Sequence, residues 1–384
     1  MQADTRQKAE SILRELVDAG LIAGAGVGIW QHGEQVLSLS VGMADRERQR
    51  PVTPGTIYRL YSMTKPVTAC AAMILLERGK LRRDTPVARY FPTFGGTGVT
   101  VGHLLSMTSG LTYDGTDSET TRQTAALFAE AAQKLNTGRD LTTAQMAERL
   151  GRIPLLFRPG THWQYSASAD VLGAVLERVA DMPFADFLRQ ELFDPLDMRD
   201  TAFYVPPEKQ DRLAQVYEAR NGALTPYLHS HLAIDHAMKA EPAFASGGAG
   251  LASTLRDYGR FAAMLLADGR LDGRQYLRPE TVRAFTTTPG VSGSPQDMYR
   301  SFPHFRGYRY GNLLRMCVNP AEARLHCHKG EYGWDGWLGT DFVNDPATDT
   351  TFLLMVQVTG TDVIPWRFRL RDCIWNGLFG EEGE

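Results

Sequence analysis

The chain lacks the features that mark several large classes of protein. Its 384 residues carry a formal net charge of −3, and no basic face of the size that nucleic-acid binding requires is visible. No apolar run approaches the roughly 18 residues of a membrane-spanning helix. Residues 1–8 contain no apolar stretch of the kind found in a signal peptide. We therefore expect neither a nucleic-acid partner nor a membrane partner.

Cysteine is scarce as well. The four cysteines are too few and too scattered for a disulfide framework, and the one on the apolar run behind Lys65 is expected to be a buried thiol. This scarcity favours a reducing, cytoplasmic location. Hydrophobic residues make up 43% and charged residues 22%, which is ordinary for a soluble globular protein. The cysteines are Cys70, Cys317, Cys327 and Cys373.

Strong metal motifs are also missing. Two groups of histidines stand close together, but neither has the spacing of a strong zinc pattern. We interpret the first group as loop histidines near a rim. In the second group, residues 326 and 328 would share one strand face, but no fourth ligand is evident, so we expect no metal and no cofactor. The groups are His229, His231, Asp235 and His236, and the run His326-Cys327-His328. A G-x-S-x-G sequence is absent too, which argues against an α/β-hydrolase.

The sequence does contain an S-x-x-K motif, Ser62-Met63-Thr64-Lys65. A serine hydroxyl is a poor nucleophile until something removes its proton. Residues three apart on a helix share a face, so this spacing places the amine of Lys65 within reach of the Ser62 hydroxyl. Residues 67–76 read as the helix that follows, and its first turn favours a developing negative charge. Alone, the motif is a weak pattern, and a helix start that carries a solvated lysine is its more common explanation.

Two further segments hold candidate catalytic groups. Tyr165 stands directly before a helical run and is interpreted as a proton carrier whose pKa the charge of Lys65 would lower. The alternative is an ordinary semi-buried tyrosine. Residues 333–346 are rich in glycine and aromatic residues, and a glycine on a strand allows another backbone to approach closely. Such a strand could offer a main-chain N–H to an oxyanion, or it could be an edge strand with aromatic packing.

The hydrophobic periodicity predicts an α/β (α+β) fold with an antiparallel sheet flanked by helices. Residues 1–80 and 304–384 would together form the α/β domain, and residues 81–303 a second, mostly helical domain, with the active site in the cleft between them. The expected helices cover residues 9–17, 67–76, 171–182, 184–193, 255–266 and 366–378, and the expected strands cover residues 25–31, 35–41, 308–318, 334–343 and 350–358.

Together the three motif segments resemble the serine β-lactamase and penicillin-binding-protein family, whose signatures include S-x-x-K and K-T-G. The resemblance is closest to the family VIII carboxylesterases, which look like class C β-lactamases. Residues 103–111, 192–198 and 248–254 are also similar to family segments, in the expected order. The resemblance covers nearly the whole chain and implies a β-lactamase-like fold.

The resemblance also implies roles for individual residues. Ser62 would be the nucleophile that is acylated, and Lys65 and Tyr165 would act as general base and acid. Which of these two holds the proton stays open. The backbone N–H groups of Ser62 and Trp337 would form the oxyanion hole, where one donor typically contributes about 3 kcal/mol.

Two departures from the family pattern bear on the substrate. Family lactamases carry Tyr-x-Asn, and here Ala167 stands in the place of the asparagine. They also carry Lys-Thr-Gly, whereas here Trp334 removes the cation and Asp335 adds a negative charge. Both changes weaken the case for an anionic β-lactam or peptide, and a tryptophan at this place is what the esterase members show. The sequence therefore predicts a carboxylesterase that cleaves small or short-chain esters through a Ser62 acyl-enzyme.

Several residues are candidates for substrate binding, with core packing as an equal alternative for the aromatic ones. Whether Asp335 faces the cleft stays open, because successive residues of a strand point to opposite faces. The candidates are Trp163, Tyr332, Trp334, Asp335, Gly336 and Trp337.

Three other functions remain open at this point. The first is a β-lactamase, DD-peptidase or amide hydrolase of the same fold. The second is an acyltransferase that uses the same Ser-Lys-Tyr machinery. The third is a catalytically silent binding protein, against which the intact Ser62, Lys65 and Tyr165 argue. The physiological ester, its chirality and the oligomeric state are not indicated by the sequence.

Overall fold

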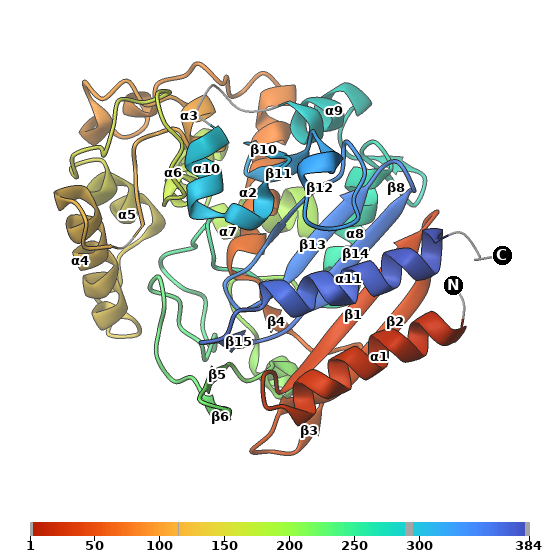
Figure 1. Ribbon diagram of the computed structural model, residues 1–384. Coiled ribbons are helices and arrows are strands. Elements are labelled where there is room, and N and C mark those ends of the chain that lie inside the picture. Colours follow the sequence, from red (N-terminus) through yellow and green to blue (C-terminus); the bar gives the residue numbers. More distant parts are fainter. Residues whose placement is uncertain (1–2, 114, 289–294, 381–384) are drawn as a thin grey trace.

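A computed structural model describes residues 3–113, 115–288 and 295–380 (Figure 1). Within this part of the chain, an eight-stranded sheet has the order β10-β11-β12-β13-β14-β1-β2-β3, and every neighbouring pair is antiparallel. The two ends of the chain therefore meet in one sheet, where β1 pairs with β14. The strands are β1 Gly24–Gln31, β2 Glu34–Asp45, β3 Arg50–Pro51, β10 Tyr308–Gly311, β11 Leu314–Cys317, β12 Tyr332–Asp335, β13 Asp341–Asp345 and β14 Thr350–Met355.

Helices cover both faces of this sheet (Figure 1). α1, Ala3–Asp18, and α11, Ile364–Phe379, pack against each other on one face, and α8, Leu255–Leu266, packs on the other. This arrangement confirms the predicted fold class, an antiparallel sheet flanked by helices.

The alternation of residues along β1 explains how two different layers fit against it. Val27 and Ile29 belong to the apolar core shared with α1 and α11. Gly26, on the opposite face, lies so close to α8 that a Cβ there would sit 2.9 Å from Cδ1 of Leu255. A small residue on that face lets the helix approach the strand closely.

α2, the helix behind the S-x-x-K motif, lies among several of the remaining elements. α2 and α6 pack against each other, and α2 also contacts β12. The further helices are α2 Thr64–Glu77, α3 Val101–Leu105, α4 Glu119–Lys134, α5 Thr143–Leu150, α6 Ser168–Ala180, α7 Phe184–Leu188, α9 Pro279–Thr287 and α10 Pro295–Ser301. The small strands are β4 Tyr58–Arg59, β5 Tyr217–Arg220, β6 Ala223–Pro226, β7 Ala252–Ser253, β8 Arg270–Leu271, β9 Arg274–Gln275 and β15 Val358–Thr359.

The predicted division into two domains stays a prediction. α8 lies in the range 81–303 by sequence, yet it packs on the sheet that residues 1–80 and 304–384 build. Any boundary drawn by sequence position alone therefore separates α8 from the strands that it covers.

Three strands predicted near the C-terminus are wrong in extent. Residues 308–318 form the hairpin β10–β11, with the turn at Asn312 and Leu313, whose φ angles are 53° and 60°. Residues 334–343 contain the end of β12, a turn and the start of β13, and residues 350–358 contain β14 and the start of β15. The alternation of apolar residues continues through these turns, so periodicity alone did not reveal them.

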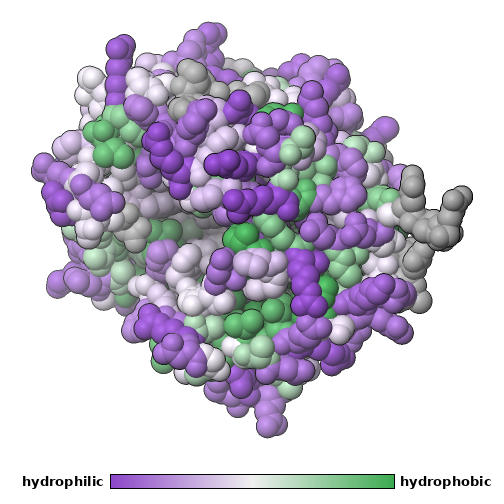
Figure 2. Space-filling view, in the orientation of Figure 1, coloured by the Kyte–Doolittle hydropathy of each residue, from purple (hydrophilic) through white to green (hydrophobic). Residues whose placement is uncertain are grey.

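Most of the face seen in Figure 2 is hydrophilic, and apolar residues gather near its middle. In the described chain, no helix combines the length and the apolar character needed to cross a membrane.

Candidate active site

The motif residues Ser62 and Lys65 lie at the junction of two helical segments. Ser62 belongs to a 3-10 turn, Tyr61–Met63, and Lys65 to the first turn of the α-helix α2 that follows it. Lys65 Nζ lies 3.1 Å from Ser62 Oγ and donates a hydrogen bond of 2.8 Å to the carbonyl of Gly248. Ser62 keeps 9% of its surface exposed, whereas Lys65 is fully buried. The predicted proximity of amine and hydroxyl is confirmed.

Burial changes the chemistry of the Lys65 amine. Loss of hydration lowers the pKa of Lys65 to about 7, while the carboxylates of Asp170 and Asp335 partly oppose this shift. A substantial fraction of the amine is therefore neutral at neutral pH. A neutral amine 3.1 Å from a serine hydroxyl can accept its proton.

Asp170 was not singled out in the sequence, although it supports this lysine. Its Oδ1 accepts hydrogen bonds from Ser246 Oγ at 2.5 Å and from the N–H of Gly248 at 3.1 Å. The carbonyl of the same glycine accepts from Lys65, so Asp170 is linked to Lys65 through one peptide. Burial raises the pKa of Asp170. The sequence does contain a signal that could have revealed Asp170, because it is a lone acidic residue in the otherwise apolar start of α6.

Tyr165 lies next to both motif residues. Its side chain hydrogen-bonds with that of Ser62, and its hydroxyl accepts a bond of 3.1 Å from Trp334 Nε1. Lys65 Nζ lies over the Tyr165 ring, 4.6 Å from the centroid. The lowered pKa expected for Tyr165 is wrong, because burial raises it and outweighs the hydrogen bonds from Ser62 and Trp334. Tyr165 therefore remains a neutral phenol.

Gly336 brings the end of β12 close to the nucleophile turn. A Cβ on Gly336 would lie 2.3 Å from the carbonyl oxygen of Leu60, and the hydroxyl of Thr340 donates to the same oxygen at 3.2 Å. Trp337 follows in a turn closed by the N–H of Gly339 bonding to the carbonyl of Gly336 at 2.9 Å. In the described chain, the N–H groups of Ser62 and Trp337 donate to no backbone carbonyl. Both donors are thus available to an oxyanion.

Substituting Gly336 by alanine should separate these two donors. The added methyl group has no room beside Leu60 and Thr340, so β12 must move away from the Ser62 turn. Because displacements near 1 Å can reduce catalysis about 100-fold, we expect kcat/KM of the Ser62-dependent reaction to fall about 10- to 100-fold. Gly55→Ala is the control, since its Cβ would meet Arg212 at an ordinary 3.4 Å. Unchanged kinetics in Gly336→Ala would contradict the assigned role.

The aromatic candidates for substrate binding lie in different parts of the structure. Trp163 and Trp334 pack around Tyr165, with ring centroids 6.2 and 5.6 Å from its ring. Trp337 instead lies beside Tyr61, at 5.0 Å. The hydroxyl of Tyr332 is held by Asn344 Nδ2 at 2.9 Å, and this residue belongs to the apolar core.

Asp335 forms an ion pair that the sequence did not reveal. Its carboxylate lies 2.8 Å from Nη1 of Arg367, a buried residue of α11. Nε of the same guanidinium lies 3.7 Å from Asp341. Asp335 stands where the family pattern has a neutral threonine. Its negative charge is therefore balanced by Arg367 of α11.

The two histidine groups considered as metal ligands contact aromatic and acidic side chains instead. Among the described residues, no cluster of three or more histidine, cysteine or carboxylate side chains is arranged to hold a metal ion. His236 contacts Tyr61, and His231 stacks on Trp337. In the second group, His328 Nδ1 lies 2.6 Å from Asp345. Cys327 Sγ lies 3.6 Å from Cys317 Sγ, and both are free thiols.

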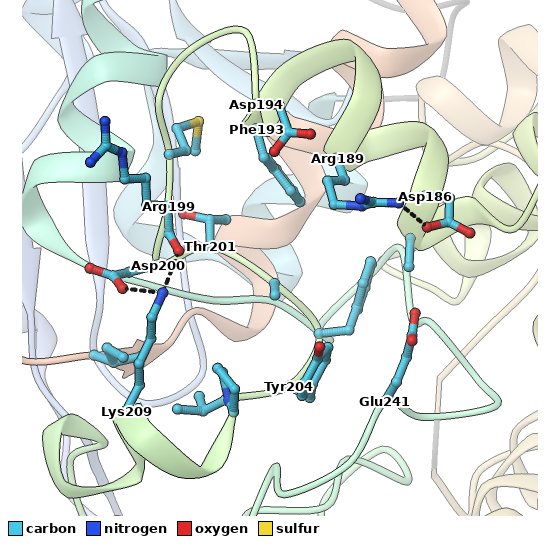
Figure 3. Close-up of a pocket in the computed structure, with 17 residues that line it drawn as sticks. Asp186, Arg189, Phe193, Asp194, Arg199, Asp200, Thr201, Tyr204, Lys209 and Glu241 are labelled. Atoms are coloured by element: carbon cyan, nitrogen blue, oxygen red, sulfur yellow. Dashed lines mark hydrogen bonds and ion pairs between the residues drawn. The ribbon is translucent and has the colours of Figure 1, made fainter.

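A cavity of about 350 Å³ lies away from this centre, and Figure 3 shows its lining. Ser62, Lys65 and Tyr165 do not line it. Two of its cations are paired locally, Arg189 with Asp186 at 2.7 Å and Lys209 with Asp200 at 2.8 Å. The cavity therefore offers none of the groups that the chemistry at Ser62 requires.

Comparison with known proteins agrees with this geometry. The model of the family described as Beta-lactamase matches residues 9–371. Protein Rv1367c of Mycobacterium tuberculosis is 31% identical over 371 residues, which cover 91% of this chain and 89% of the relative. Esterase EstB of Burkholderia gladioli is 31% identical over 399 residues, which cover 97% of this chain and 96% of the relative.

A solved structure is similar over the same length. EstCE1, described as a hydrolase with promiscuous acyltransferase activity, is 26% identical, with a TM-score of 0.82 over 97% of this chain and 98% of its own. These findings confirm the fold and the family resemblance predicted from the motifs. They also support the predicted enzyme class, a carboxylesterase.

Proposed function

Because this chain belongs to the Beta-lactamase family, we propose that it hydrolyses small or short-chain carboxylic esters through an acyl-enzyme on Ser62. The observation that carries the proposal is the buried Lys65 amine, 3.1 Å from Ser62 Oγ and with a pKa lowered to about 7. The proposal takes further support from the similarity to Esterase EstB.

In the proposed acylation step, Ser62 Oγ attacks the carbonyl carbon of the ester while Lys65 Nζ takes the hydroxyl proton. The tetrahedral intermediate carries its negative charge on the former carbonyl oxygen, between the N–H groups of Ser62 and Trp337. As the bond to the alcohol breaks, Tyr165 gives its proton to the leaving alkoxide. The Lys65 ammonium, which lies over the ring of Tyr165, stabilises the resulting phenolate and returns a proton to it.

Deacylation repeats these steps with water in place of the serine. Lys65, neutral again, takes a proton from the attacking water, and the new tetrahedral intermediate forms in the same oxyanion hole. Ser62 Oγ leaves and is reprotonated. The sum is one ester and one water converted into one acid and one alcohol, with no group of the enzyme consumed.

The surroundings of Tyr165 favour an ester over a β-lactam. In the family lactamases a lysine stands where Trp334 stands, and its charge helps to bind the substrate carboxylate. Here the indole N–H donates to the phenol at 3.1 Å without adding charge, and Asp335 is already paired with Arg367. A neutral ester needs no cation at this place.

An ester series tests the proposal. We expect turnover of p-nitrophenyl acetate and butyrate, falling toward the dodecanoate, with a chromogenic cephalosporin cleaved at least about 100-fold more slowly. Ser62→Ala should lose at least about 10⁴-fold in kcat. A cephalosporin preference, or ester turnover that survives in Ser62→Ala, would contradict the proposal.

Acyl transfer is the second candidate, since EstCE1 is described as having this activity. An added alcohol would then compete with water for the acyl-enzyme. Product analysis with a short-chain alcohol such as butanol distinguishes hydrolysis from acyl transfer. A transferase forms the butyl ester in excess over the free acid.

A further inference from the structure

Tyr61, the residue directly before the nucleophile, has an unusual backbone conformation. Its φ is 47°, in the left-handed region, and its side chain is fully buried. A bulky residue rarely adopts this region, and it persists only where the surroundings hold it. The N–H of Ser62 is part of the peptide bond between Tyr61 and Ser62. Contacts that fix Tyr61 therefore also orient this donor of the proposed oxyanion hole.

His236 holds the side chain of Tyr61. The Tyr61 hydroxyl lies 2.6 Å from His236 Nε2. Burial raises the pKa of Tyr61 and lowers that of His236 to about 3, with the charge of Arg59 adding to the second shift. At neutral pH the phenol therefore donates to a neutral imidazole.

The loop that carries His236 is itself anchored near the nucleophile. Arg59 donates hydrogen bonds to the carbonyl of His236 and, at 2.6 Å, to that of Ala214. Arg59 precedes Tyr61 by two residues, so the loop and the nucleophile segment are joined at two points.

The second donor of the oxyanion hole is held by the same loop. The Trp337 ring lies 5.0 Å from that of Tyr61. His231 stacks on Trp337, with centroids 4.1 Å apart and planes inclined by 27°. One loop thus contacts the side chains next to both donors.

We propose that His236 and His231 are positioning residues for the oxyanion hole. His236 holds the Tyr61 phenol and thereby the N–H of Ser62, while His231 holds the Trp337 indole and thereby its N–H. Neither imidazole transfers a proton in the reaction. This inference rests on the proposed ester hydrolysis at Ser62.

A double-mutant cycle tests the first contact. Tyr61→Phe and His236→Phe should each lower kcat for p-nitrophenyl butyrate about tenfold, with KM within about twofold, because the lost bond orients a donor used mainly in the transition state. The double variant should be no slower than either single variant. His236→Gln, which keeps a polar group, should recover part of kcat. The rate of Ser62 labelling by a serine-reactive phosphonate should follow kcat.

Tyr276→Phe is the matched control, because it removes a phenol that donates at 2.8 Å to the carbonyl of Pro195, outside the proposed site. Its kcat should equal that of the wild type. Multiplicative losses in the double variant, or losses matched by Tyr276→Phe, would overturn the inference. If wild-type turnover depends on Ser62 while Tyr61→Phe is fully active, the inference fails and the esterase proposal stands.

A second pair of variants tests the stacking contact. His231→Phe keeps an aromatic ring over Trp337 and should retain kcat within about twofold. His231→Ala removes the ring and should lower kcat about threefold or more at similar KM. Equal activity of the two variants, whether high or low, would overturn the role of His231.

Discussion

Replacing Lys65 with methionine is expected to lower kcat/KM for p-nitrophenyl butyrate about 10³-fold, within the range that general-base catalysis contributes. Methionine has a similar length but no lone pair able to take the Ser62 proton. The substitution removes a fully buried amine and also its hydrogen bond to the Gly248 carbonyl. These two effects oppose each other, so the free energy of unfolding should change little. Thermal unfolding beside the kinetics therefore separates lost chemistry from lost structure.

The pH dependence of the wild type follows from the same residue. Burial lowers the pKa of Lys65 to about 7, and only the neutral amine can accept a proton. As pH rises through about 7 the neutral fraction grows, so kcat/KM should rise over this interval and then level off. The profile of kcat/KM reports the free enzyme, in which this pKa applies. The rising limb should be absent from the residual activity of Lys65→Met.

Two variants make the test specific. Lys65→Arg keeps a positive charge that cannot be removed at these pH values, so it should be as inactive as Lys65→Met if the lysine is a base. Lys80→Met, at an exposed position, should behave as the wild type. Recovery of activity in Lys65→Arg would show that charge, and not proton transfer, is the contribution of this residue.

The sequence predicted those parts of the site that depend on local geometry. Ser62 and Lys65 are three residues apart, and the helical turn alone determines their separation. Tyr165 and Trp334 were predicted from motifs, and their hydrogen bond joins residues from two distant segments. The fold class followed from the order of helices and strands.

The rest of the site depends on contacts between distant segments that periodicity does not encode. Asp170 is connected to Lys65 by hydrogen bonds through Gly248, 78 residues further along the chain. The balance of charge at Asp335 depends on Arg367, which α11 brings to the end of β12. The wrong pKa expected for Tyr165 has the same origin, because the sequence indicated a nearby cation but not the degree of burial.

Removing the hydroxyl of Tyr165 should have an effect that depends on the leaving group. In Tyr165→Phe the ring packing remains, but no phenol proton is available to the departing alkoxide. An alkyl alkoxide is a poor leaving group and needs this proton, so kcat/KM for ethyl butyrate should fall about 10³-fold. Nitrophenolate leaves without protonation, so the loss for p-nitrophenyl butyrate should be only about tenfold. The two esters share one acyl group, and therefore one deacylation step.

Tyr310→Phe is a closely matched control for this experiment. Among the residues that the structure describes, the buried Tyr310 hydroxyl has no hydrogen-bond partner. Its ring lies 4.9 Å from that of Trp334 in the same aromatic cluster. Its removal should leave both esters unaffected. Equal losses for the two esters in Tyr165→Phe would mean that Tyr165 orients Ser62 and does not protonate the leaving group. Full activity toward ethyl butyrate would remove Tyr165 from the mechanism and leave Lys65 as the sole proton carrier.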